Sequence, residues 1–265
     1  MKNKILSALG SHPWAEALIW HNSIDSTNDE AKRLAAAGAP HGTVILAGHQ
    51  SKGRGRIGRT FHSPEGKGVY CSVILRPQCK PEDLMHLTCA VGVAMCDAVE
   101  AVCGVRPGIK WINDLVLGNR KLGGILTELA LDADGSVRYA VVGVGINCSH
   151  TQYDFPEELR EIATSLEMAT EKTADQAQLS AEIIKAFTET DKHLLRGKYG
   201  IMDRYRADCI TIGKDIVVHT SQESFRGTAL DVDPDGALVV RSDNGRIQAV
   251  QSGEVSVRGL YGYCQ

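Results

Sequence analysis

The pattern of apolar residues changes near Thr211, and this change limits what the chain can fold into. Before it, short apolar runs of strand type, such as Thr43–Ala47 and Val69–Leu75, alternate with stretches of helical spacing, of which Leu84–Val102 is the longest. After it, short β-type runs follow one another, separated by turn sequences rich in Asp, Asn and Gly. The pattern therefore predicts a unit of helices and strands followed by a small antiparallel barrel or sandwich of ~50 residues.

Local signals place the individual elements. A helix is expected to begin near Ser26 or Thr27, each of which has an acidic residue three positions on, and to end at Gly38 and Pro40. Other strands of the first unit are expected at 109–112, 115–117, 122–129 and 139–146, and two helices around 157–167 and 174–196. In the second unit we expect strands at 215–218, 225–232, 237–240, 247–250 and 254–257. The domain boundary is expected near 205–212, dividing the chain into domains 1–208 and 209–265.

Composition and charge exclude several classes of protein. The 265 residues are 43% hydrophobic and 23% charged, as in a folded globular protein and unlike a disordered or collagen-like chain. No stretch approaches the roughly 18 apolar residues that span a bilayer. The segment Met1–Trp14 lacks the apolar region of a signal peptide, so we expect it to be part of the fold. With a net charge of −3, nucleic-acid binding would need a local basic patch.

The eight cysteines show no disulfide or metal pattern. They include no C-x-x-C pair and no Cys/His cluster of zinc type. Cys89, Cys96 and Cys103 are seven residues apart, on one stripe of a helix, where cysteine behaves as a small buried hydrophobe. We therefore expect reduced thiols in a cytoplasmic protein.

The segment Gln50–Arg59, which directly follows a predicted strand, carries the clearest chemical signal. It contains four cations and three glycines, and no Asp or Glu occurs between Ala31 and Pro64. Glycine lets the backbone approach a ligand and change shape, and arginine offers forked donors to phosphate or carboxylate. The alternatives are a solvated basic loop and an RNA-binding Arg/Gly segment. A solvated loop gains nothing from the glycines, and the segment lacks the interleaved aromatic residues that would favour RNA binding. We interpret the segment as a mobile loop that binds an anion.

Two further segments carry weaker signals. Lys110-Trp111-Ile112-Asn113-Asp114 and the following 120–128 place amide, carboxylate and ammonium groups around one strand-turn-strand unit. Trp111 is expected in the core, whereas for Lys110 and Lys121 a functional role is at least as well supported as a solvated one. The glycine-interrupted strand 141–147 permits close approach of a ligand, although packing explains it equally well.

Together these segments resemble the biotin–protein ligases (biotin–[biotin carboxyl carrier protein] ligases) in order and across nearly the whole chain. The resemblance rests on G-R-G-R-x-G-R within 50–59, K-W-x-N-D at 110–114, R-K-L-G-G-I-L-x-E at 120–128, G-x-G-I-N at 143–147, Asp25–Asn28, and Ser252–Val255 with Val257 and Arg258. The ordered set is far more specific than any single piece.

The resemblance implies an α+β fold: a central mixed β-sheet with flanking helices, shared with lipoate ligases, plus a C-terminal SH3-like β-barrel. It also implies a two-step reaction. Biotin attacks the α-phosphate of MgATP to give biotinyl-5′-AMP and pyrophosphate, and a lysine of a biotin carboxyl carrier protein domain then takes the biotinyl group. The implied cofactor is ATP with Mg²⁺, with biotin as substrate and no DNA or membrane partner, in a monomer or homodimer.

The resemblance also assigns residues to roles. It implies biotin binding by Ser26, Thr27, Asn28, Gln50, Arg54, Gly55, Arg56 and Lys121, and nucleotide binding by Arg56, Arg59, Phe61, Asn113 and Asn147. The catalytic set is Lys121, Arg54, Lys110 and Asp114, with Asp114 orienting or deprotonating the incoming lysine. Phe61 stands where the family often has a Trp that covers the intermediate. The Gly/Arg loop is expected to order over the anhydride and exclude water.

Two other functions compete with this interpretation. A lipoate or octanoate ligase or transferase of the same superfamily would need a longer acyl tunnel and, for transfer, a cysteine such as Cys148. A non-enzymatic nucleic-acid-binding protein would use the basic loop and bind less tightly as salt rises. Many bacterial relatives carry an N-terminal winged helix-turn-helix of roughly 60 residues that binds DNA. Here the resemblance begins at Asp25, and the residues before it are too few for that module. We therefore expect a ligase without operator binding.

Overall fold

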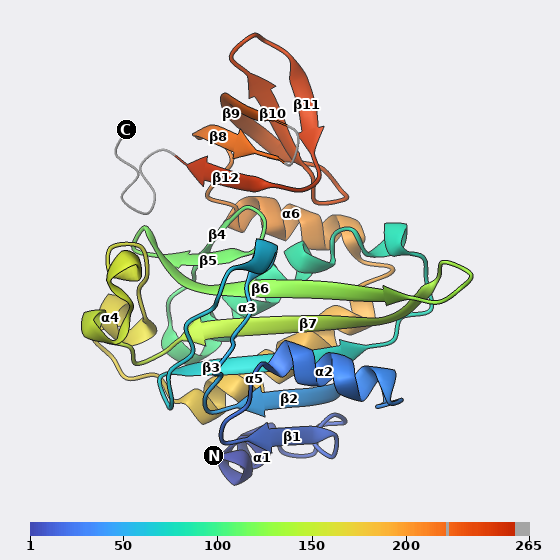
Figure 1. The fold of residues 1–265 in the computed structure, drawn as a ribbon, viewed down its shortest axis with the longest axis vertical. Coiled ribbons are helices and arrows are strands. Elements are labelled where there is room, and N and C mark those ends of the chain that lie inside the picture. The colour runs from blue at the N-terminus through green and yellow to red at the C-terminus, as the bar shows by residue number, and fades with distance from the viewer. Residues whose placement is uncertain (221–222, 258–265) are drawn as a thin grey trace.

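The computed structural model describes residues 1–220 and 223–257, which form two β-sheets joined through a helix (Figure 1). The larger sheet has seven strands in the order β1-β2-β3-β7-β6-β5-β4. Their bounds are β1 Leu18–His21, β2 Thr43–Ala47, β3 Gly68–Leu75, β4 Gly108–Lys110, β5 Asp114–Leu117, β6 Arg120–Leu131 and β7 Val137–Asn147. The β1–β2 pair is parallel and the other pairs are antiparallel, so the sheet is mixed, as expected.

Helices cover both faces of this sheet (Figure 1). Helix α2 (Thr27–Ala36) packs on one face, where Ala31 and Ala35 meet Ile45, Ile74 and Val141. The opposite face carries α3 (Leu87–Cys103) and α5 (Gln176–His193), with α1 (Lys2–Leu9) packed against α5. Because side chains alternate along a strand, β2 and β3 supply residues to both cores, which is why every residue of the two strands is buried.

The segment Pro81–Cys103, which contains α3, is long and apolar enough by composition to cross a membrane. However, 67% of its apolar window is buried inside the protein, as in the core helix of a soluble domain. Cys89 and Cys96 lie within this buried stripe, as the seven-residue spacing predicted, and Cys103 is half-buried.

The C-terminal strands form a five-stranded antiparallel sheet in the order β11-β10-β9-β8-β12. They span β8 Asp215–His219, β9 Ser224–Val232, β10 Leu238–Ser242, β11 Ile247–Val250 and β12 Glu254–Val257. Helix α6 (Lys198–Asp208) leads into this sheet. Trp111, buried as expected, donates from its indole nitrogen to the carbonyl of Gly236 (2.9 Å) and so ties the two sheets together. The expected fold class is confirmed.

Several local expectations need correction. Residues 157–167 do not form one helix: they contain a 3₁₀ turn, Glu157–Leu159, and the start of the short helix α4 (Leu166–Thr170), which Ser165 caps. The strand expected over 109–112 ends at Lys110. Strand β1 and helices α1 and α6 were not predicted from the sequence. Strand β1 has four residues and α1 has eight, too few for a clear period, and α6 buries only Met202 and Tyr205. The predicted motif residue Arg258 lies outside the described residues.

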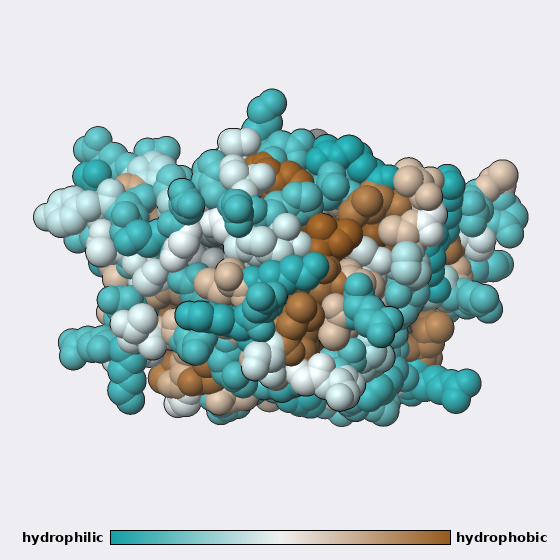
Figure 2. All heavy atoms as spheres, turned by 90° about the horizontal axis from the view of Figure 1, so that it is seen from below, coloured by the Kyte–Doolittle hydropathy of each residue, from teal (hydrophilic) through white to brown (hydrophobic). Residues whose placement is uncertain are grey.

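Strand β1 lies at the edge of the large sheet. Seen from that end, the surface is mostly hydrophilic, with one apolar band running between the polar side chains (Figure 2). The residues predicted from the sequence to bind substrates lie elsewhere, around a pocket on the α2 face of the sheet.

Candidate active site

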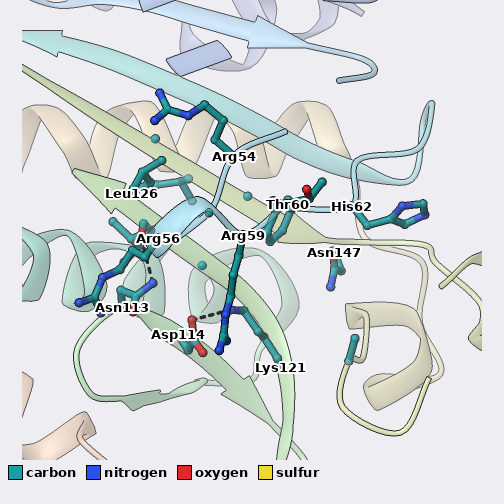
Figure 3. Close-up of a pocket in the computed structure, with 18 of the residues that line it drawn as sticks. Arg54, Arg56, Arg59, Thr60, His62, Asn113, Asp114, Lys121, Leu126 and Asn147 are labelled. Carbon is teal, nitrogen blue, oxygen red and sulfur yellow. Dashed lines mark hydrogen bonds and ion pairs between the residues drawn. The ribbon is translucent and has the colours of Figure 1, made fainter. Parts of the chain in front are cut away.

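A pocket of about 260 Å³ collects most of the residues singled out from the sequence. Figure 3 shows the Gly/Arg loop lying across it, above side chains from β5, β6 and β7. Every residue of the predicted catalytic, biotin-binding and nucleotide-binding sets is in its lining. The lining also includes residues to which the sequence assigned no binding or catalytic role, some of them inside the quoted motifs: Thr60, His62, Trp111, Gly124, Ile125, Leu126, Gly143, Val144, Gly145, Phe155, Leu159, Ile162, Ala163 and 253–256.

One end of the pocket is a buried hydrogen-bonding network at the start of α2. Ser26 caps the helix as predicted, its Oγ accepting from the amide of Asp29 (3.4 Å). The amide and hydroxyl of Thr27 both donate to Gln50 Oε1 (2.8 and 3.0 Å). Gln50 Nε2 in turn donates to Ser63 Oγ (2.9 Å), so the orientation of the Gln50 amide is fixed from both sides. The network offers donors and acceptors to a small polar ring.

Asn28 anchors the same end of the pocket against the sheet. Its side-chain amide nitrogen donates to Glu128 Oε2 (3.0 Å), and its Oδ1 accepts from the hydroxyl of Ser72 (2.6 Å). Strand β7 makes room for it only through Gly143, where an added Cβ would lie 1.8 Å from Asn28 Oδ1. The glycine in the middle of this strand is therefore explained by close approach of a side chain.

The cations of the Gly/Arg loop have distant partners, although the sequence around them holds none. Arg54 pairs with Asp29 (2.7 Å) and with Glu128 (3.0 Å), at the α2 end of the pocket. Arg56 donates to Asn113 Oδ1 (2.9 Å) and to the carbonyl of Gly253 (3.2 Å). The loop is thus tied to α2, to the β4–β5 turn and to the C-terminal sheet at once.

Ile57, at the tip of the loop, sits in the left-handed region with φ of 53° and is 70% exposed. A β-branched residue in this region is strained, and an exposed apolar side chain adds no packing. The loop conformation is therefore held by its arginines and not by local preference.

The floor below the loop carries a second group of charges. Lys121 Nζ donates to Asp114 Oδ1 (2.6 Å), and both side chains are partly buried. Lys110 is close to the same carboxylate. The pKa of Lys110 is lowered to about 8: burial is the largest cause, Lys121 and Arg59 act in the same direction, and the nearby carboxylates of Asp114 and Glu254 partly offset them. Three cations (Lys110, Lys121 and Arg59) and two carboxylates (Asp114 and Glu254) therefore share this part of the pocket, which suits a ligand with more negative charge than the protein itself supplies.

An aromatic and apolar wall closes the other side. The Phe61 ring packs against Gly145, where an added Cβ would lie 2.4 Å from a ring carbon. Asn147 is held by a bond from its side-chain nitrogen to the carbonyl of Thr164 (2.9 Å). Phe155 stacks on His150 with ring centroids 4.8 Å apart. The wall offers flat apolar surface beside a fixed amide, an environment that suits a heterocyclic base.

His150, behind this wall, is 1% exposed, and neither ring nitrogen has a hydrogen-bond partner among the described residues. Burial, followed by the neighbouring His62, lowers its pKa to about 4. The imidazole is therefore neutral near pH 7 and serves as an aromatic support for Phe155.

Two alternatives to this site are an acyl-enzyme on Cys148 and a metal centre. Cys148 is fully buried, and burial raises its pKa to about 12, so its thiol is neither ionised nor accessible. In residues 1–220 and 223–257, no three His, Cys, Asp or Glu side chains gather in a metal-binding arrangement.

Comparison with known proteins places this pocket in a family. The Biotin/lipoate A/B protein ligase family matches residues 20–147, and the Biotin protein ligase C terminal domain matches residues 211–258. Over 257 residues the chain is 34% identical to the "Bifunctional ligase/repressor BirA" of Bacillus subtilis, covering 97% of this chain and 78% of that protein. It is 31% identical over 236 residues to the "Biotin--[acetyl-CoA-carboxylase] ligase" of Mycobacterium tuberculosis, covering 87% and 85% of the two chains.

A solved structure has a similar fold. "Biotin protein ligase from Aquifex aeolicus in complex with biotin and ATP" superposes with a TM-score of 0.76 at 28% identity, covering 91% of this chain and 98% of that one. The fold and pocket thus define an enzyme of the class that also includes lipoate ligases. Within that class, the chain belongs to the biotin protein ligase family.

Proposed function

We propose that this protein activates biotin as biotinyl-5′-AMP and transfers it to one lysine of a biotin carboxyl carrier protein domain. The observation that carries the proposal is the arrangement of the pocket. A hydrogen-bonding end at Thr27, Asn28 and Gln50, a cationic centre and an aromatic wall lie in one continuous cavity. This order matches a ureido ring, a carboxylate meeting a phosphate, and a purine.

In the first step a biotin carboxylate oxygen attacks the α-phosphorus of ATP. The new O–P bond forms as the bond to the β-phosphate oxygen breaks, and pyrophosphate leaves with its electron pair. The barrier is repulsion between two anions, so fixed cations stabilise the transition state directly. We assign this role to Lys121 and Lys110, with Arg54, Gly55 and Arg56 along the loop that covers the carboxylate.

In the second step the ε-amine of the carrier lysine attacks the acyl carbon, and AMP leaves. The amine must be neutral to attack and then lose a proton. We assign Asp114 to orient the incoming amine, because its Oδ1 already accepts a bond from an ammonium group, that of Lys121. Asp114 orients the incoming amine or takes the proton that the amine loses, and the pH dependence of the transfer step tests the second role.

We assign nucleotide binding to Arg56, Arg59, Phe61, Asn113 and Asn147, and biotin binding to Ser26, Thr27, Asn28 and Gln50 together with the residues of the covering loop. Mg²⁺ would enter with the triphosphate and neutralise part of its charge; we assign it no protein ligands. We further propose that residues 1–208 and 209–265 are the two domains and that the enzyme acts in the cytoplasm, as a monomer or homodimer, without DNA.

The rival functions fit the pocket less well. A transferase that forms an acyl-enzyme needs an accessible thiolate, whereas the Cys148 thiol is buried with its pKa raised to about 12. A nucleic-acid-binding protein needs exposed cations, whereas Arg54 and Arg56 are each engaged by two partners at the pocket.

The test is a direct one. The purified chain is incubated with biotin, MgATP and a carrier domain, and the carrier is analysed by mass spectrometry. We expect a mass increase on a single lysine, and biotin-dependent exchange between ATP and pyrophosphate without the carrier. Replacing biotin by lipoate or octanoate should abolish both signals; exchange that depends on either of these acids would refute the proposed substrate.

A further inference from the structure

Strand β12 of the C-terminal sheet forms part of the pocket, since residues 253–256 line it. Pairing with β8 places Glu254 opposite His219 and fixes the start of the strand. The backbone is held close there: Gly253 has φ of 145°, and an added Cβ would lie 2.6 Å from the His219 carbonyl oxygen. The carboxylate of Glu254 is therefore presented to the pocket from a defined position.

Arg59 is the cation that meets this carboxylate. Its Nη2 lies 2.5 Å from Glu254 Oε2, while the side chains of Arg59 and Glu254 remain 71% and 36% exposed. Such an exposed ion pair is weak and is readily exchanged for another anion. Arg54 differs, because two carboxylates hold it at the α2 end of the pocket.

We propose that Glu254 is a competing anion that occupies Arg59 in the pocket before the nucleotide arrives, and that the triphosphate of the incoming nucleotide displaces the Glu254 carboxylate from Arg59. The inference rests on the proposed function and names the carboxylate that the nucleotide displaces from Arg59. A phosphate offers a guanidinium the same forked geometry as a carboxylate, and a triphosphate carries more charge. Glu254 therefore keeps the arginine near its working position but competes with the incoming substrate.

Removing this competition should tighten nucleotide binding. In Glu254→Gln the side chain keeps its shape but loses its charge, so Arg59 no longer has to leave a carboxylate. We expect the dissociation constant for MgATP to fall by about threefold to fivefold at low ionic strength, the range expected for an exposed pair, and the gain to shrink as salt is added. Biotin affinity should not change.

The experiment measures binding of a non-hydrolysable ATP analogue, with Mg²⁺ and without biotin, to the full chain by calorimetry. Glu254→Gln is compared with Asp132→Asn, which removes the same charge from an exposed pair with Arg138 on β7. Only Glu254→Gln should bind the analogue more tightly. In an Arg59→Gln background, which should itself bind more weakly, Glu254→Gln should give no further gain. Glu254→Ala gives the same test if Glu254→Gln does not fold.

Each outcome decides a separate point. Tighter binding that depends on Arg59 supports the exchange. Unchanged or weaker binding in Glu254→Gln overturns it, as would an equal gain in the Arg59→Gln background. If the unmodified chain binds no analogue at all, the proposed function fails as well.

Discussion

Lys121 Nζ and Asp114 Oδ1 lie 2.6 Å apart because of a break in the pairing of β5 with β6. Asp114 pairs with Gly124, but the register shifts between Leu115 and Val116, so that Val116 pairs with Lys121. This bulge brings a lysine and an aspartate from neighbouring strands to the same side of the sheet. The ammonium group is thereby held below the Gly/Arg loop, where the acyl phosphate would form.

Lys121→Ala should reduce biotin-dependent ATP–pyrophosphate exchange by at least about a hundredfold, the effect of removing one fixed charge from a transition state. The thermal unfolding midpoint should change little, since Lys121 is partly exposed and only one pair is lost. Arg120→Ala is the matched control, because Arg120 points to Glu161 and does not line the pocket. Near-normal exchange in Lys121→Ala would remove this residue from the chemistry.

Arg54→Gly should release activated biotin and increase biotin labelling of bystander proteins. The substitution removes the ties from the loop to Asp29 and Glu128. Arg56→Gly should act in the same way, since it loses the bonds to Asn113 and Gly253. Labelling is measured by blotting a protein mixture after incubation with biotin and MgATP.

Ile57→Asn is the control in the same loop. Asparagine tolerates the left-handed conformation of this position, and the arginine ties remain, so labelling of bystanders should stay at the wild-type level. If Arg54→Gly and Arg56→Gly also label no more than the wild type, the loop does not retain the intermediate.

Nucleotide affinity should fall as the pH rises above about 8. The pKa of Lys110 in the folded protein is about 8, so this lysine loses its charge well below the ordinary value of 10.5, and binding a polyphosphate then requires uptake of a proton. Calorimetric titration with the ATP analogue at pH 7, 8, 9 and 9.5 should show this decline. Lys110→Arg, which keeps its charge, should flatten it, whereas Lys52→Arg should not; a constant affinity up to pH 9.5 contradicts the prediction.

Gly143→Ala should weaken biotin binding by about tenfold or more, because the new methyl group displaces Asn28 and with it the bonds to Ser72 and Glu128. Gly200→Ala in α6 is the control. No atom lies within 4 Å of an added Cβ there, so it should bind biotin normally and gain helix stability. Equal biotin affinity in the two variants would show that Asn28 does not shape the biotin end.

His150 should make the fold sensitive to acid. Its pKa is about 4 when folded and 6.5 when exposed, so the unfolded chain binds more protons between these values and stability falls as the pH drops from 6.5 to 4. The full effect is about 3 kcal/mol. His150→Phe, which preserves the stack on Phe155, should reduce this loss in urea unfolding measured at pH 7 and pH 4.5; an unchanged loss would assign the acid sensitivity to other groups.

The sequence alone determined the main strands, the α2 and α3 helices, the change to a small β domain and several of the segments that line the pocket. Apolar spacing and turn chemistry are local properties, and the Gly/Arg loop and K-W-x-N-D segment are continuous motifs. The tertiary structure decided which charges meet. Arg54 forms an ion pair with Glu128, Arg59 with Glu254, and Lys121 with Asp114 across a bulge. These pairs join residues from different elements, and a one-residue register shift is enough to make or break such a contact, so no pattern along the chain specifies them.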